Sequence, residues 1–205
     1  MNQTNTEITF EELTKHLMDD NSPSEYFNSL DKELRRYPLS LIKELKNVEQ
    51  SPKYHPEGNV WNHTMMVVDE ASRVKNHCND SKVFMWAALL HDIGKPDTTK
   101  IRKGRITSYD HDVVGAKLSK KFLEHYSNDK DFIDKVCMMV KYHMHMLYVL
   151  KGLPFGNPRL MIKETDIHDL ALLCRCDRLG RIGADIEAEQ KNYKNFLEMI
   201  LHYKV

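Results

Sequence analysis

Residues 91–95 combine an imidazole, a carboxylate and an ammonium group at the end of an apolar segment. His91 and Asp92 follow the run Ala88-Leu89-Leu90, and Gly94 and Lys95 come shortly after them. Imidazoles and carboxylates are common ligands of divalent metals, and the lysine ammonium is a compact charge that can neutralise phosphate oxygens. The stretch therefore predicts a metal site that faces a phosphate group.

A metal ion that activates water needs several nitrogen or oxygen ligands and one open position. His63 and Asp177 are further candidates, because each is predicted at a helix end or on an otherwise apolar helix, where a polar group needs a partner. Neighbouring residues of a helix point about 100° apart. His91 and Asp92 can therefore both bind only if their helix ends there, as Gly94 indicates. A mixed ligand set of this kind favours Mn, Fe, Co, Ni or Zn over Ca, with Mg as an alternative.

Each of these residues also has an ordinary structural interpretation. His63 alone would be a hydrogen-bonded core histidine, and His91 could complement the dipole at a helix C-terminus. Asp177 could pair with a neighbouring arginine. The ordered set favours ligands, because Asp92 would oppose the same helix dipole unless a cation lay beside it.

Helix-type periodicity dominates the chain and must position these side chains. Helices are predicted after the caps Thr9 and Ser22, and over residues 39–48, 60–77, 82–90, 111–126, 131–146, 166–178 and 184–203. Ser81 is expected to cap the helix 82–90, which is apolar on nearly all sides and should lie at the centre of the core. Strand patterns are almost absent, apart from a short hairpin near residues 103–106. The predicted fold class is therefore all-α.

The composition describes an ordinary globular chain of 205 residues, a length that fits one domain. Thirty basic and thirty acidic residues give no net charge, so nothing global favours nucleic acid or an anionic membrane as a partner. There is no signal-peptide pattern and no apolar run of the ~18 residues that a membrane span needs. The four cysteines form no CxxC pair and are expected to be reduced, so the predicted location is cytoplasmic.

The order His63, His91, Asp92 and Asp177 resembles the H…HD…D signature of the HD-domain superfamily of metal-dependent phosphohydrolases. Residues 49–64 are similar to the start of the HD domain in bacterial tRNA nucleotidyltransferases, the CCA-adding enzymes. Residues 91–96, 111–116 and 176–181 continue that similarity in the same order.

The resemblance covers roughly residues 22–185 and implies an HD-type helical bundle with a metal site in its core. A single domain is expected over residues 1–205, with residues 1–21 as a helical extension and residues 186–205 as a helix packed on the core. The nucleotidyltransferases carry a catalytic head domain before the HD part. Residues 1–21 are too short to supply one, so nucleotide addition is not expected.

The resemblance also implies roles for individual residues. His63, His91, Asp92 and Asp177 would hold one metal ion. His111 and His143 match positions that hold a second ion bridged by Asp92 in two-metal members, or contact phosphate in one-metal members.

Further roles follow from general chemistry. Lys95 would neutralise phosphate oxygens, Arg178 could add a bidentate phosphate contact, and Asp92 could orient the attacking water or accept its proton. His55 either lines the pocket or holds its loop. The basic residues Lys100, Arg102, Lys103 and Arg105 are by default a solvated loop, with electrostatic guidance of an anionic substrate as the alternative.

The predicted function is a metal-dependent phosphohydrolase, a phosphomonoesterase or phosphodiesterase, with one or two divalent ions and a nucleotide or another small phosphoester as substrate. Two alternatives remain open. One is an RNA- or tRNA-associated module that binds or trims RNA ends, and the other is a metal- or nucleotide-binding sensor without turnover. The oligomeric state is not predicted.

Overall fold

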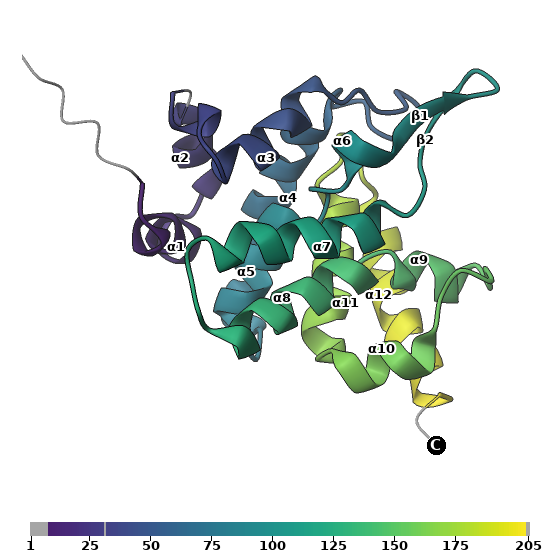
Figure 1. The fold of residues 1–205 in the computed structure, drawn as a ribbon. Coiled ribbons are helices and arrows are strands. Elements are labelled where there is room, and N and C mark those ends of the chain that lie inside the picture. Colours follow the sequence, from purple (N-terminus) through teal and green to yellow (C-terminus); the bar gives the residue numbers. More distant parts are fainter. Residues whose placement is uncertain (1–7, 31, 204–205) are drawn as a thin grey trace, which may run out of the picture.

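The computed structural model describes residues 8–30 and 32–203, which form a bundle of helices with one small hairpin (Figure 1). The all-α fold class is confirmed. The elements are α1 (Phe10–Asp19), α2 (Pro23–Ser29), η1 (Glu33–Arg35), α3 (Leu39–Lys43), η2 (Glu44–Asn47), α4 (Val60–Val74), η3 (Lys75–His77), α5 (Ser81–Leu90), α6 (Lys95–Thr98), β1 (Thr99–Arg102), β2 (Arg105–Ser108), α7 (His111–Glu124), α8 (Lys130–Tyr142), α9 (His145–Leu150), α10 (Pro158–Glu164), α11 (Ile167–Leu179) and α12 (Ile186–Leu201). None of the helices in these two ranges is both long and apolar enough to cross a membrane.

Helix α5 occupies the centre of the bundle, as its apolar sequence predicts. Every side chain from Val83 to Leu90 is at most 4% exposed, and the helix packs against α1, α4, α8 and α11. Burying one large apolar side chain stabilises a fold by about 1.5–3 kcal/mol, so α5 is firmly anchored. Because it ends at Leu90, it delivers His91 and Asp92 into the interior of the protein.

The helix starts follow the predicted chemistry with three differences, one of which is that the Ser22 side chain makes no capping hydrogen bond at the start of α2. Thr9 caps α1 through its side chain, as predicted. The Thr9–Glu12 spacing of a capping box also predicts that Glu12 reaches back to the cap, but its carboxylate accepts a hydrogen bond from the Tyr26 hydroxyl instead. The N-cap of α5 is Asp80, so the prediction of Ser81 is wrong. Aspartate accepts the free N–H groups of the first turn at least as well as serine, and here it comes one residue earlier.

The helix predicted over residues 131–146 is two helices, α8 and α9, which meet at His143. The Nδ1–H of His143 donates to the Val140 carbonyl at 2.6 Å. A helix end leaves such carbonyls without intrahelical partners, and a histidine in the last turn can satisfy one of them. The break fixes the ring of His143 at the end of α8.

The C-terminal helix α12 packs against α11 and α9. Its Phe196 and Ile200 are buried in a second apolar cluster together with Met161 of α10, a helix that the periodicity did not predict. The hairpin is longer than expected and spans residues 99–108. The division of the chain into a core, an N-terminal extension and a packed C-terminal helix stays a prediction.

Candidate metal centre

His63 lies on α4 and is completely buried. Its Nε2 is 2.9 Å from Asp177 Oδ1 and 3.9 Å from Asp92 Oδ2, so the site brings together residues that are far apart in the chain. Its Nδ1 lies 3.1 Å from the Gly180 carbonyl and 3.0 Å from Glu57 Oε1. The ring is therefore held on one edge by acceptors and presents the other edge to the two aspartates.

His91 and Asp92 both point into the same site because α5 ends just before them. The Nδ1–H of His91 donates to the Ala88 carbonyl at 2.8 Å, and its Nε2 lies 3.2 Å from Asp92 Oδ2. Both side chains are 1% exposed. The two side chains therefore reach one site although His91 keeps helical backbone angles, with φ of −54° and ψ of −36°.

His111 and His143 approach the other oxygen of the same carboxylate. Their Nε2 atoms are 3.2 Å apart and lie 3.5 Å and 3.9 Å, respectively, from Asp92 Oδ1. The Nδ1–H of His111 donates to the Ser108 carbonyl at 2.6 Å. Asp92 is thus shared by two groups of possible ligands, one with His63 and His91 and one with His111 and His143.

All four histidines have Nδ1 directed at a backbone carbonyl, which can only accept a hydrogen bond. When these rings are neutral, Nδ1 carries the proton and the Nε2 lone pairs converge on Asp92. The structure leaves two buried atoms in this cluster without any hydrogen bond, His91 Nε2 and Asp92 Oδ2. Unsatisfied polar atoms in a core are costly, and a divalent cation would satisfy both. The residues present therefore fit a divalent metal.

The surroundings favour the deprotonated forms of both aspartates, of His111 and of His143, whereas at His63 the hydrogen bonds with Asp177 and Glu57 outweigh burial and raise the pKa. Burial by itself would raise the pKa of Asp92, but His91 and Lys95 outweigh it and hold that pKa well below its usual range. Burial would also raise the pKa of Asp177, but Arg181 and His63 outweigh it and hold that pKa well below its usual range. Burial lowers the pKa of His111 to about 3 and also lowers that of His143.

Lys95, the first residue of α6, lies beside the same carboxylate. Its Nζ is 2.7 Å from Asp92 Oδ2 and donates to Gln50 Oε1 at 2.7 Å, and the residue is 9% exposed. The distance to Asp92 is short, although the two groups are not aligned as a hydrogen bond. Sequence reasoning gave Gln50 no role, and only its place in the similar block 49–64 marks it.

Glu57 is a second residue to which the sequence assigned no role. Its Oε1 lies 2.8 Å from His55 Nδ1 and 3.0 Å from His63 Nδ1, and its side chain is 1% exposed. Burial would raise the pKa of this carboxyl, but hydrogen bonds from the two histidines help to lower it to about 2. His55 is therefore held by its loop neighbour and also borders the metal cluster, so both interpretations of it agree with the geometry.

Two glycines draw the backbone of the site together. A Cβ atom on Gly94 would lie 2.2 Å from the His111 carbonyl oxygen and 2.5 Å from the Gly115 nitrogen. A Cβ atom on Gly180 would lie 2.5 Å from Val67 Cγ2, on α4. Gly94 has an ordinary backbone φ of −83°. Its role is close approach between α6 and α7 rather than an unusual conformation at a helix end.

Arg178 points away from the cluster toward α12. Its Nε and Nη2 both donate to the carboxylate of Glu189. A phosphate contact by Arg178 would require this pair to open, and it stays a prediction. His145 accepts the Asn157 N–H through Nε2 at 3.2 Å, which is a structural contact. The four cysteines are free, as expected.

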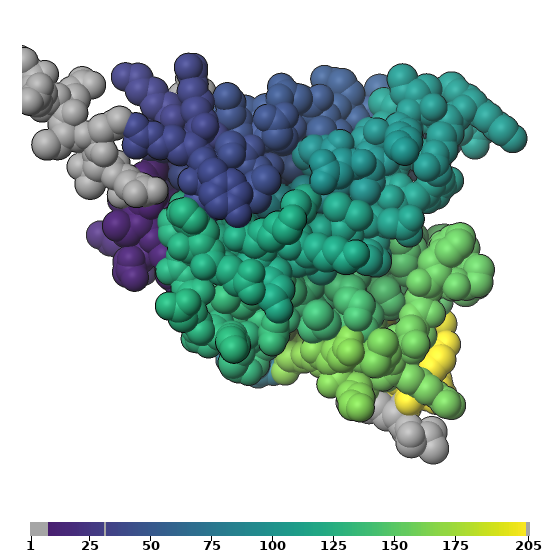
Figure 2. All heavy atoms as spheres, viewed as in Figure 1, coloured from purple at the N-terminus to yellow at the C-terminus, as the bar shows by residue number. Residues whose placement is uncertain are grey.

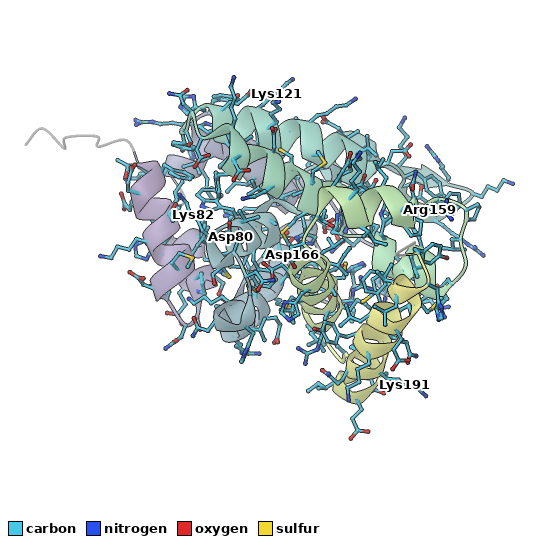
Figure 3. All side chains as sticks on the ribbon, turned by 90° about the horizontal axis from the view of Figure 1, so that it is seen from below. Asp80, Lys82, Lys121, Arg159, Asp166 and Lys191 are labelled. Carbon is cyan, nitrogen blue, oxygen red and sulfur yellow. The ribbon has the colours of Figure 1, made fainter. Side chains whose placement is uncertain are left out.

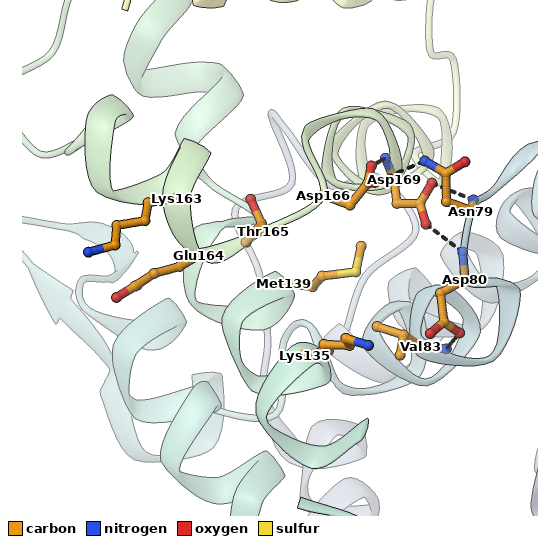
Figure 4. A pocket seen from close by; sticks show the side chains of 10 residues that line it. All are labelled: Asn79, Asp80, Val83, Lys135, Met139, Lys163, Glu164, Thr165, Asp166 and Asp169. Atoms are coloured by element: carbon orange, nitrogen blue, oxygen red, sulfur yellow. Dashed lines mark hydrogen bonds between the residues drawn. The ribbon is translucent and has the colours of Figure 1, made fainter. Parts of the chain in front are cut away.

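A separate pocket lies among α8, the start of α5 and the segment before α11 (Figure 4). The dashed bonds in that view show the Asp169 carboxylate accepting the N–H groups of Asn79 and Asp80, each at 2.9 Å. Asp169 thereby joins α11 to the start of α5. None of the predicted site residues lines this pocket.

Comparison with known proteins finds similar proteins that share the name Multifunctional CCA protein. The Multifunctional CCA protein of Actinobacillus pleuropneumoniae serotype 5b is 28% identical over 145 residues, which cover 68% of this chain and 35% of the relative. The protein of the same name from Laribacter hongkongensis is 29% identical over 190 residues, 89% of this chain and 45% of the relative. The chain thus spans less than half the length of these relatives.

The family model described as "HD domain" matches residues 60–181, which is more than half of the chain. The matched range begins at the first turn of α4 and ends just after α11, so it contains His63, the His91–Asp92 pair and Asp177. The chain belongs to the HD domain family, a superfamily of metal-dependent phosphohydrolases.

Proposed function

We propose that the protein is a metal-dependent phosphohydrolase that cleaves a phosphomonoester or phosphodiester of a nucleotide or another small molecule. The observation that carries the proposal is the convergence of four imidazole Nε2 atoms and two carboxylates in a buried cluster that contains unsatisfied atoms. A cluster of this kind is expensive to maintain unless it binds a cation. Family membership supports hydrolysis as the use of that cation.

We assign His63, His91, Asp92 and Asp177 to one divalent ion. His111 and His143 would hold a second ion together with Asp92, because the two oxygens of this carboxylate face different histidine pairs. The donor set favours Mn, Fe, Co, Ni or Zn, with Mg as the alternative. A bound ion of this type supplies a water molecule that loses its proton near neutral pH.

The side chains of the protein then bind and orient the reactants. Lys95, the ammonium nearest to Asp92, neutralises the phosphate oxygens, and its flexible stem allows it to turn from the carboxylate to the substrate. Asp92 orients the attacking water or accepts its proton. His55, whose side chain is 14% exposed, borders the substrate on the side of His63. We also propose a cytoplasmic location, because the four cysteines are all free.

The test is a hydrolysis screen of mono- and diesters with each candidate metal, run on the wild type and on Asp92→Ala. The substitution removes the carboxylate that both ion sites share, so it should abolish bound metal and hydrolysis together. Full hydrolysis by Asp92→Ala would contradict the proposal. Metal binding without turnover of any ester by the wild type would support the sensor alternative instead.

The names of the relatives favour one alternative, an RNA- or tRNA-associated module. Phosphate contacts make nucleic-acid affinity fall steeply with salt. Salt-dependent tRNA binding by a wild-type protein that hydrolyses no small ester would therefore favour this alternative over the phosphohydrolase.

A further inference from the structure

The hairpin β1–β2 projects from the bundle as a narrow arm, seen in teal at the upper right of Figures 1 and 2. Its two strands form a two-stranded sheet, and no other strand within residues 8–30 and 32–203 pairs with either of them. Lys103 and Gly104 join them with φ angles of 50° and 73°, which is typical of a two-residue type I′ turn. A two-stranded hairpin without further support is only marginally stable, so the composition of its surface matters.

One face of this arm is strongly basic. The strand register places Arg102 directly opposite Arg105, and Lys100 comes two residues before Arg102 on the same face. Lys103 lies at the turn between them. All four side chains are exposed, and none of the carboxylates that the structure describes forms an ion pair with them. We call Lys100, Arg102, Lys103 and Arg105 the basic face.

Folding alone does not account for this arrangement. Like charges directly opposite each other destabilise a strand pair, and here the pair Arg102–Arg105 lies on a hairpin with little other support. An anionic partner would convert the repulsion into attraction. The Arg102 guanidinium also lies over the ring of Tyr109, 4.8 Å from its centroid, and that ring is 59% exposed. A guanidinium and an exposed ring offer a stacking surface for a base beside the cationic groups.

The arm is rooted in the metal centre at both ends. Strand β1 begins directly after the short helix α6, whose first residue is Lys95. The last residue of β2, Ser108, accepts the Nδ1–H of His111 at 2.6 Å. A strand of phosphates bound along the basic face would therefore continue toward the side chains assigned to the reacting phosphate.

We propose that the basic face binds the phosphate backbone of a single-stranded nucleic acid whose end reaches the metal centre. The position of that end rests on the proposed function, and the basic face extends the substrate from a small phosphoester to an oligonucleotide. The zero net charge of the chain does not oppose this, because attraction at physiological salt is local, with a screening length of about 8 Å. Four positive charges in six residues create such a local field.

The experiment measures binding of a fluorescein-labelled oligouridine of about twelve nucleotides by fluorescence anisotropy, a length within the range that single-strand sites cover. The variant is Arg102→Gln/Arg105→Gln. The matched control is Lys191→Gln/Lys194→Gln, which removes the same charge from α12, far from the arm (Figures 1 and 3). Binding is measured between about 50 and 200 mM salt, with unlabelled uridine monophosphate as a competitor.

The hairpin variant should bind the oligouridine at least tenfold more weakly than the wild type. Its salt dependence should be flatter by about 1.4 in log–log slope, since each lost single-strand phosphate contact contributes about 0.7. The α12 control should match the wild type. The hairpin variant should unfold thermally close to the wild type, because it loses both a like-charge pair and the contact of Arg102 with the Tyr109 ring, which oppose each other.

Equal binding by the hairpin variant and the wild type, or an equal loss in the α12 control, would overturn the proposal. These outcomes are separate from failure of the proposed function, which is measured by hydrolysis of small esters. A wild type that hydrolyses small esters but binds oligouridine independently of the arm refutes the basic face alone. Hairpin-dependent binding without any hydrolysis refutes the phosphohydrolase and leaves the nucleic-acid surface in place.

Discussion

The close approach of α6 and α7 gives the sharpest prediction about how the fold builds the site. The substitution Gly94→Ala would place a Cβ atom 2.2 Å from the carbonyl oxygen of His111 and 2.5 Å from the Gly115 nitrogen. Both are backbone atoms, so the strain cannot be relieved by turning a side chain. Because Gly94 has a φ that any residue adopts, the whole cost comes from this contact. Overpacking of this kind costs about 1–3 kcal/mol.

Gly115→Ala is the matched comparison on the other side of the same contact. Its Cβ atom would meet Val140 Cγ1 at 3.2 Å, a side-chain methyl group that can give way. Alanine is also favoured over glycine inside a helix by about 0.8–1 kcal/mol, and Gly115 lies within α7. The two effects oppose each other, so the net change in the free energy of unfolding should stay within about 1 kcal/mol.

The assay is urea unfolding of both metal-free variants, followed by metal analysis after reconstitution. Gly94→Ala should be the less stable variant and should also bind less metal, because the strain displaces the backbone that carries His111. If Gly94→Ala unfolds within about 0.5 kcal/mol of the wild type and retains all of its metal, the close approach does not position the site.

Three further predictions follow from individual contacts. Glu57→Gln removes the negative charge that holds His63 and should weaken metal binding about 10–100-fold in equilibrium dialysis, while Glu44→Gln, an exposed carboxylate on η2, should leave it unchanged. Arg178→Ala leaves the Glu189 carboxylate without its arginine partner and should lower the unfolding free energy by about 1.5–3 kcal/mol. A double-mutant cycle with Glu189→Ala that shows no coupling would contradict a stabilising ion pair. Burial lowers the pKa of His145 to about 4, below its unfolded value, so the folded state binds fewer protons and loses stability as the pH falls from about 6.5 to 4. His145→Gln should reduce the pH dependence of the unfolding free energy in this range by up to about 1.4 kcal/mol per pH unit. An unchanged pH dependence would contradict this role of His145.

The sequence predicted the helices that carry the metal centre because their apolar periodicity was strong. Helix α5 is apolar on nearly every side and lies at the centre of the core, which placed His91 and Asp92 at the end of a buried helix. Short elements escaped prediction. Helices α6 and α10 have only four and seven residues, so neither extends over the two or more turns that a periodic pattern needs.

The supporting contacts of the site could not be read from the chain. Glu57 contacts two histidine rings because its loop lies against α4. No local sequence pattern predicts how that loop lies. The ion pair of Arg178 with Glu189 depends on where α12 packs, so a guanidinium near Asp177 in sequence points elsewhere in space. The break at His143 was missed because the residues on both sides of it favour helix.

We assign Asp92 to two groups of ligands that bind divalent ions. Elemental analysis of protein purified without chelator and reconstituted with each candidate metal tests this assignment. The two-ion arrangement predicts about two equivalents in the wild type, about one in His143→Ala and none in Asp92→Ala. A wild type that holds no stoichiometric metal under any of these conditions, or an Asp92→Ala variant that holds as much as the wild type, would contradict the claim.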